Sequence, residues 1–293
     1  MIISIDIGGS SVKTALWNNE KLENKKSFSS PDNWADMEKE LFKTIYEYKK
    51  IENIEGIAFS VPGIPNYDTG KIDGASSLRY IHNPEFLTIF EQEFKIPVTF
   101  ENDANCACIA EINHESLKDK RDMIFVVIGT GIGGSIVYNR KIQEGSHSFA
   151  GEFGMMLIDG RNEWAILGSA VHMAEKVSKI KNIELSGEEV FNLADSGDEI
   201  CKKAVEELFH YLALGIYNLQ YIIDPEIIVL GGGITAKEDL VENIEKEMDK
   251  IMQYGQRSPL YPDIRKANYG NDANLIGAGY HFYEMNGNEY GRK

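Results

Sequence analysis

Two segments of the chain share one pattern, in which a β-favouring run leads into a glycine-rich turn and a second β-favouring run follows. The first segment covers residues 2–17 and contains IDIGGS, and the second covers residues 122–141 and contains IGTGIGG. Apolar and β-branched residues flank both turns, which predicts two β-hairpins. A third glycine cluster, LGGGIT, follows another predicted strand at 227–230. The pattern therefore predicts two α/β halves that begin alike, with no low-complexity linker between them.

The second turn also contains the spacing G-x-G-x-x-G, at Gly129, Gly131 and Gly134. A dinucleotide fingerprint requires these glycines to open a helix, with an acidic residue at the end of a second strand about 20 residues further on. Here residues 135–139 (SIVYN) continue as a strand, and the region beyond reads EGSHSFAGEFG. No Walker A sequence occurs either. The dinucleotide and Walker interpretations are therefore both disfavoured.

The remaining interpretation is a hairpin turn whose backbone N–H groups approach phosphate oxygens, since glycine has no Cβ to prevent a close approach. A hydroxyl such as that of Thr130 can add a donor. Two such turns facing each other across a cleft can bracket a nucleoside triphosphate, and the third cluster can admit adenine and ribose. The alternative is that all three clusters are only tight turns.

Helical patterns fill the segments between these turns. The first covers residues 34–48, where apolar residues recur at spacings of three and four: Trp34, Met37, Leu41, Ile45 and Tyr48. In the second half, helices are expected at 166–179, 188–194, 199–221 and 239–252. Residues 64–83 are polar and turn-rich, which predicts a loop or hairpin.

The composition limits the partners that the chain can bind. Its 293 residues carry a net charge of -16, which disfavours nucleic acid and anionic membranes, because phosphate-rich surfaces attract basic proteins. The sequence contains no run of about 18 apolar residues, so it predicts no membrane span. The first residues are typical of a strand rather than of a signal peptide. The three cysteines are the sparse set expected in a reducing compartment. We therefore expect a soluble, cytoplasmic enzyme.

Two aspartates lie where predicted strands end. Asp6 precedes the first glycine turn, where a carboxylate can hold Mg²⁺ through water or can cap the turn. Asp103, in ENDANCA, stands where a predicted strand at 96–101 gives way to a helix. It can act as the base in phosphoryl transfer, or it can cap the helix N-terminus. The sequence pattern leaves both roles open for each aspartate.

Six motifs together resemble those of one known family. DIGGS, VPG, ENDANCA, IGTGIGG, AGEFG and LGGGIT occur in this order, over nearly the whole chain, in the ROK family of bacterial sugar kinases and repressors. Within that family the chain is most similar to β-glucoside kinases. The resemblance implies the actin/hexokinase-like (ribonuclease H-like) α/β fold, with two domains around a central cleft. The first domain would contain residues 1–118 and a C-terminal helix at about 274–293, and the second would contain residues 119–273.

The resemblance also implies a role for each motif. Asp103 would be the catalytic base for the sugar 6-hydroxyl, and Asp6 would hold Mg²⁺ through water. The residues that would contact the sugar are Gly63, Ser77, Asn102, Glu152 and Glu163. Those that would contact the ATP phosphates and adenosine are Asp6, Gly8, Gly9, Ser10, Thr130, Gly131, Gly133, Gly232 and Gly233.

The chain departs from the family pattern in the sugar region. Many relatives follow the glutamate of AGEFG with a histidine and a cysteine-rich zinc site, but here Met155 takes the histidine position and MMLIDGRNEWAILG contains no cysteine. Zinc needs about four N or S ligands, so we expect no structural zinc. Ser77 stands where glucokinase-like members usually carry Asn, and Glu163 aligns only across the missing loop. These changes fit a sugar with a bulky substituent.

The sequence thus predicts an ATP- and Mg²⁺-dependent kinase that phosphorylates a β-glucoside such as cellobiose at its 6-hydroxyl. N-acetylmannosamine kinase and glucokinase are the alternatives within the family, and a non-catalytic sugar-sensing regulator is the alternative from a different class. A repressor would carry an N-terminal helix-turn-helix, whereas this sequence starts at the first hairpin. The resemblance also implies a homodimer.

Overall fold

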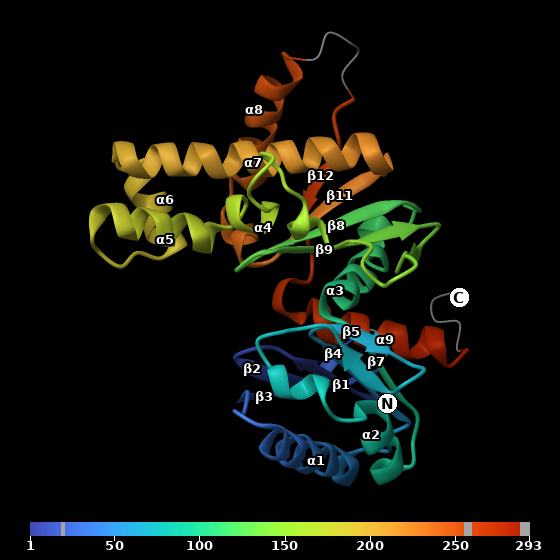
Figure 1. Ribbon diagram of the computed structural model, residues 1–293. Coiled ribbons are helices and arrows are strands. Elements are labelled where there is room, and N and C mark those ends of the chain that lie inside the picture. Colours follow the sequence, from blue (N-terminus) through green and yellow to red (C-terminus); the bar gives the residue numbers. More distant parts are fainter. Residues whose placement is uncertain (19–20, 255–259, 288–293) are drawn as a thin grey trace. The chain divides into compact units, whose positions relative to one another are not determined.

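The computed structural model describes residues 1–18, 21–254 and 260–287 (Figure 1). The chain divides into two compact units. Unit 1 contains Met1–Lys118 and Asn271–Lys293, and unit 2 contains Asp119–Gly270. Residues 288–293 of the expected first domain lie outside the described residues. Unit 1 therefore contains segments from both ends of the sequence.

Unit 1 is built on a five-stranded sheet. Its strands are β1 (Ile2–Ile7), β2 (Ser11–Trp17), β3 (Leu22–Ser29), β4 (Gly56–Val61) and β7 (Val98–Asn102), in the order β3-β2-β1-β4-β7. β1, β4 and β7 are parallel, whereas β2 is antiparallel to both of its neighbours. The first predicted hairpin is therefore confirmed as β1–β2. A separate two-stranded sheet pairs β5 (Ile64–Asn66) with β6 (Lys71–Asp73), which confirms a hairpin within residues 64–83.

Helices cover both faces of this sheet (Figure 1). They are α1 (Trp34–Ile51), α2 (Phe86–Phe94), α3 (Asp103–Ile112) and α9 (Ala273–Met285). Side chains alternate along a strand, so Ile3, Ile5 and Ile7 of β1 enter the core formed with α1 and α2. Ser4 and Asp6 contact α9 instead. This alternation directs two polar side chains of β1 toward α9.

The apolar stripe expected at 34–48 forms the buried face of α1, where Met37, Leu41, Ile45 and Tyr48 are buried. The side chain of Asn33 caps this helix by accepting a hydrogen bond from the Asp36 N–H. On the opposite face of the sheet, α9 packs directly on α3.

Unit 2 repeats the sheet of unit 1. Its strands are β8 (Met123–Ile128), β9 (Ile132–Tyr138), β10 (Lys141–Ile142), β11 (Ile227–Gly231) and β12 (Ile264–Lys266), in the order β10-β9-β8-β11-β12. β8, β11 and β12 are parallel, and β9 is antiparallel to β8 and β10. The second predicted hairpin is confirmed, and both sheets share one order and one set of strand directions.

The helices of unit 2 are α4 (Trp164–Leu167), α5 (Ala170–Lys181), α6 (Gly187–Asp195), α7 (Glu199–Ile223) and α8 (Leu240–Met252). α7 contacts the other four. The single helix expected at 166–179 is wrong, because the chain breaks at Gly168 and Ser169 and a second helix begins at Ala170. Short 3₁₀ helices cover Arg79–His82, Glu115–Leu117, Phe153–Met155, Gly233–Ala236 and Gly270–Asp272.

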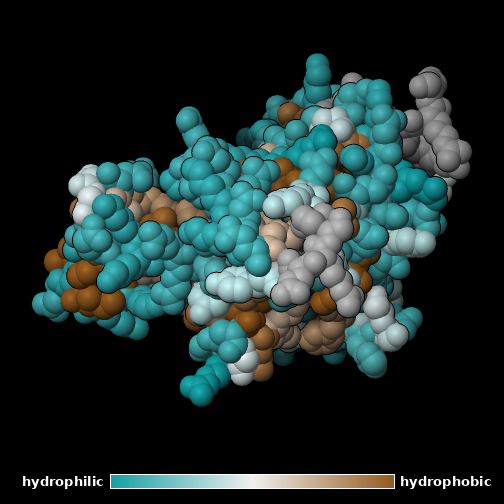
Figure 2. Space-filling view, turned by 90° about the horizontal axis from the view of Figure 1, so that it is seen from above, coloured by the Kyte–Doolittle hydropathy of each residue, from teal (hydrophilic) through white to brown (hydrophobic). Residues whose placement is uncertain are grey.

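The surface is mostly hydrophilic on the face drawn in Figure 2, in keeping with the net charge of -16. Exposed apolar side chains include Ile180 and Ile183, at the carboxyl end of α5. Among the described residues, no helix combines the length and the apolar composition that a membrane span requires.

Candidate functional site

The carboxyl ends of the three parallel strands of unit 1 lie side by side. Asp6 on β1 pairs with Ser60 on β4, and Ser60 pairs with Glu101 on β7. Ligands of α/β sheets usually bind just beyond the carboxyl ends of parallel strands. Asn102 and Asp103 directly follow Glu101, so the structure brings them to the same sheet edge as Asp6.

Asp6 is 5% exposed and is held by neighbours from three elements. Its Oδ1 accepts hydrogen bonds from the Ser60 hydroxyl at 3.0 Å and from the Asn274 amide at 2.9 Å. Its Oδ2 lies 3.7 Å from the Lys13 ammonium group. The carboxylate is thus oriented by two neutral donors on one oxygen and faces a cation with the other.

The first glycine turn is anchored through its carbonyl oxygens. Ser30 donates its hydroxyl to the Gly8 carbonyl at 2.6 Å and its N–H to the Ser10 carbonyl at 3.1 Å. Gly9 lies against Ser77, since a Cβ on Gly9 would be 2.5 Å from the Ser77 hydroxyl oxygen. The structure therefore places Ser77 beside the phosphate turn that the sequence predicts.

Asn102 caps α3. Its Oδ1 accepts hydrogen bonds from the N–H groups of Ala104 and Asn105 at 2.9 and 3.1 Å, and its Nδ2 donates to the Gly63 carbonyl at 2.9 Å. Asp103 is the first residue of the helix, and its Oδ1 also accepts from Ala104 N–H at 2.9 Å. The sequence left a capping role open for Asp103, but Asn102 provides most of the cap of α3.

The backbone of Gly63 adopts a conformation that favours glycine at this position. Its φ of +97° belongs to the region that glycine adopts readily, and a Cβ there would lie 2.7 Å from the Asp73 carbonyl oxygen. Its carbonyl accepts from Asn102, so Gly63 supports the turn before α3.

In unit 2, the turn of the β8–β9 hairpin is closed by a hydrogen bond of 2.9 Å from the Gly129 N–H to the Gly131 carbonyl. The Ser169 hydroxyl donates to the carbonyl oxygens of Gly129 and Thr130, at 2.9 and 2.8 Å. Ser169 also caps α5. Thr130 is exposed, and Gly131 and Gly133 are half-buried.

A cavity of about 410 Å³ lies beside this turn, within unit 2. Its lining includes Ile128 and Gly129 of the turn region, Gly233 of the third glycine cluster, and Val171, Phe191 and Lys237. The neighbouring Gly232 has a φ of +89°, and a Cβ on it would overlap the Ile128 carbonyl. The third cluster thus allows β11 to end close against β8. The cavity has the size and apolar lining of a small-molecule site.

Glu152 and Glu163 are exposed residues of one segment that packs on β9. Gly151, with a φ of +95°, is packed so closely that a Cβ would lie 2.5 Å from the Gly134 carbonyl. Glu152 then precedes a 3₁₀ helix, and Glu163 precedes α4 and forms a β-bridge with Leu157.

Between these two glutamates, the Asp159 side chain closes a turn. It accepts hydrogen bonds from the N–H groups of Arg161 and Asn162, at 2.8 and 2.6 Å, and from the Asn162 amide. These bonds, those from Asn162 first, hold the pKa of the Asp159 carboxyl below its usual value. Hydrogen bonds thus close the segment in which the sequence departs from the family pattern.

Four residues of these sites were not predicted: Ser30, Ser60, Ser169 and Asn274. Each reaches its partner from a distant part of the chain. Lys13 was not predicted either, and it lies opposite Asp6 in the β1–β2 hairpin. Hairpin register is the signal that would have found it.

Comparison with known proteins agrees with this architecture. The model of the ROK family matches residues 2–284. A β-glucoside kinase from Listeria monocytogenes is 33% identical over 242 residues, which cover 79% of this chain and 80% of that protein. A glucokinase from Halalkalibacterium halodurans is 29% identical over 258 residues, 80% of this chain and 77% of that protein.

A solved structure of a ROK family protein from Streptococcus pneumoniae, in complex with sucrose, has a TM-score of 0.90 and 34% identity. The match covers 98% of this chain and 99% of that one. The likeness confirms the predicted α/β, actin/hexokinase-like fold.

Proposed function

Because this chain belongs to the ROK family, we propose that it is an ATP-dependent sugar kinase. The observation that carries this proposal is the arrangement at α3, where Asn102 provides the cap and Asp103 follows it at the carboxyl edge of the parallel strands. An ionised carboxylate accepts hydrogen bonds and protons, so Asp103 can act as a base at this edge of the sheet.

In the proposed reaction, Asp103 accepts the proton of the sugar 6-hydroxyl as that oxygen attacks the γ-phosphorus of ATP. The new bond joins the sugar oxygen to phosphorus, and the bond from phosphorus to the ADP oxygen breaks. Asn102, Ser77, Glu152 and Glu163 are proposed to contact the sugar, with Gly63 supporting Asn102.

Asp6 is proposed to hold Mg²⁺ through water. Mg²⁺ usually binds one or two carboxylates together with waters and substrate phosphates, and the oriented, nearly buried carboxylate of Asp6 fits this ligand set. When bound, the ion would neutralise charge on the phosphates. The described residues contain no group of three or more acidic, His or Cys side chains that could hold a metal by themselves.

The nucleotide is proposed to contact both glycine turns, through Gly8, Gly9 and Ser10 in unit 1 and Thr130, Gly131 and Gly133 in unit 2. Adenosine is proposed to bind next to Gly232 and Gly233. The cavity beside Gly129 and Gly233 supports this proposal, because its lining is mainly apolar. Backbone N–H groups in such turns suit phosphate oxygens.

We propose a β-glucoside such as cellobiose as the acceptor. Support comes from the similar β-glucoside kinase and from the similar protein solved with the disaccharide sucrose. We further propose that the protein is a cytoplasmic homodimer that binds no nucleic acid and needs no structural zinc. The last point is supported by the residues of the segment itself, which contains no cysteine and which the hydrogen bonds to Asp159 close into a turn.

ADP release with Mg-ATP and a panel of cellobiose, other β-glucosides, glucose and N-acetylmannosamine tests the substrate. We expect kcat/KM for cellobiose to exceed that for glucose by at least about 10-fold, the discrimination that a few pocket contacts supply. Turnover on glucose or N-acetylmannosamine alone would contradict the β-glucoside assignment but keep the kinase. Absence of turnover on every sugar would favour the sensing regulator.

Replacing Asn274 by Ala tests the proposed role of Asp6. The substitution removes one of two hydrogen bonds to Oδ1, so we expect kcat/KM for Mg-ATP to fall about 10-fold, as is typical when a partner of a metal-binding carboxylate is lost. The sugar KM should stay unchanged. Asn286→Ala is the matched control, because Asn286 lies at the other end of α9 and donates to a carbonyl of that helix. Unaltered Mg-ATP kinetics in Asn274→Ala would contradict the role.

A further inference from the structure

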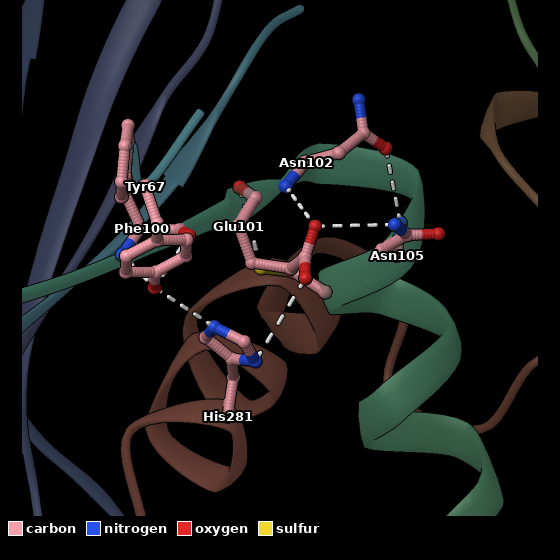
Figure 3. A network of polar contacts seen from close by, with 7 residues as sticks. Tyr67, Phe100, Glu101, Asn102, Asn105 and His281 are labelled. Carbon is pink, nitrogen blue, oxygen red and sulfur yellow. Dashed lines mark hydrogen bonds and ion pairs between the residues drawn. The ribbon is translucent and has the colours of Figure 1, made fainter. Parts of the chain in front are cut away.

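A polar network with two buried members, Glu101 and His281, adjoins the turn that carries Asn102 and Asp103 (Figure 3). Glu101 of β7 and His281 of α9 are each 8% exposed, and Glu101 Oε2 lies 3.8 Å from His281 Nδ1. The Tyr67 hydroxyl lies 3.2 Å from His281 Nε2, although 214 positions separate the two residues in the sequence. The network therefore joins β7, α9 and the β5–β6 hairpin connection.

The other carboxylate oxygen of Glu101 holds residues on both sides of Asp103. Oε1 accepts the Asn102 N–H at 2.6 Å and the Asn105 side-chain amide at 3.1 Å. Figure 3 shows both bonds converging on this one oxygen. Asp103 lies between these two partners in the sequence, so the placement of its backbone depends on Glu101.

His281 contacts Glu101, and Tyr67 contacts His281 and the backbone of Phe100. The Tyr67 hydroxyl donates to the Phe100 carbonyl at 3.0 Å and accepts from the Phe100 N–H at 3.1 Å. Since a hydroxyl has one proton, its contact with His281 requires Nε2 to be the donor. The imidazole is thereby oriented, with Nδ1 directed to Glu101.

A buried carboxylate is costly unless it is paired and hydrogen-bonded. The proton transfer proposed for Asp103 does not use Glu101, and apolar residues can often fill such a position without loss of stability. A positioning role explains why a carboxylate stands there, because displacing a reacting group by about 1 Å can cost about 100-fold in rate.

We propose that Glu101, held by His281 and Tyr67, is a positioning residue that sets the place of Asn102 and Asp103 for phosphoryl transfer. This inference rests on the proposed function of Asp103 as the base. It assigns the last helix of the chain a part in catalysis through His281, in addition to its contact with Asp6 through Asn274.

Three variants test the proposal. Glu101→Gln removes the carboxylate charge and His281→Gln removes the imidazole ring. In each variant we expect kcat to fall about 10- to 100-fold with KM for Mg-ATP within about 2-fold. Tyr67→Phe removes a single oxygen and should lower kcat by about 3- to 10-fold, and it carries the test if His281→Gln does not fold. Thr99→Val is the matched control on β7, because Thr99 is 4% exposed and its hydroxyl has no partner among the described residues. Its kcat should equal that of the unaltered protein.

Combining Glu101→Gln with Asp103→Asn separates positioning from a general structural role. If Glu101 acts through Asp103, its loss should lower the residual turnover of Asp103→Asn no further. An equal fall in both backgrounds would overturn the proposal. Unchanged kcat in all three single variants, with Asp103→Asn inactive, would overturn the positioning role and leave the kinase function intact. Full turnover in Asp103→Asn would instead overturn the function on which the inference rests.

Discussion

Asp103→Asn is expected to lower kcat about 1,000-fold or more while sugar binding persists. A positioned general base contributes about 100- to 10,000-fold to such a reaction, and an amide cannot accept the proton of the sugar 6-hydroxyl. The fold should survive, because Asn102 still caps α3. ADP release measures turnover, and calorimetric titration with the sugar measures binding.

Asp36→Asn is the matched control for this substitution, since Asp36 also lies in the first turn of a helix, α1, and is exposed. It should retain full turnover. If Asp103→Asn keeps more than about a tenth of the turnover, Asp103 is not the base, given the size of that contribution. If sugar binding disappears together with turnover, the carboxylate serves binding or structure instead.

Gly277→Ala is expected to produce the largest loss of stability from a single added methyl group. A Cβ on Gly277 of α9 would overlap the backbone carbonyl of Cys106 in α3, and a backbone group cannot rotate away. Alanine favours a helix by about 1 kcal/mol over glycine, but separating two packed helices costs more. We expect a net loss of about 3 kcal/mol, or a Tm lower by about 5–10 °C.

Scanning calorimetry measures this shift. Glu284→Ala, at an exposed position of the same helix, is the control and should move Tm by less than about 2 °C. An unchanged or raised Tm in Gly277→Ala would show that α9 can withdraw from α3 at little cost. Because α9 also carries Asn274 and His281, a shifted helix should lower turnover as well.

The elements of the fold that the sequence predicted correctly depend on near neighbours in the chain. The hairpins β1–β2 and β8–β9 follow from β-favouring runs on either side of a glycine turn, and α1 follows from its apolar stripe. The prediction of a single helix at 166–179 was wrong because the outcome there depends on residues that are distant in the sequence. Its break at Ser169 depends on hydrogen bonds to the carbonyl oxygens of Gly129 and Thr130, about forty positions earlier, and tertiary contacts override local propensity.

The features of the candidate site also fall into two groups, those encoded by neighbouring residues and those that depend on distant contacts. By itself, the sequence determined that Asp6 lies at the end of a strand that leads into a glycine-rich turn, and that Asp103 lies where a strand gives way to a helix. Strand ends and turns are encoded within a few residues. Only the tertiary structure decided which side chains hold the two aspartates. Asn274 is 268 positions from Asp6, and His281 reaches Glu101 from the same last helix. Such pairings arise because parallel strands end at one edge and a distant helix packs across them, and no local pattern of residues records that arrangement.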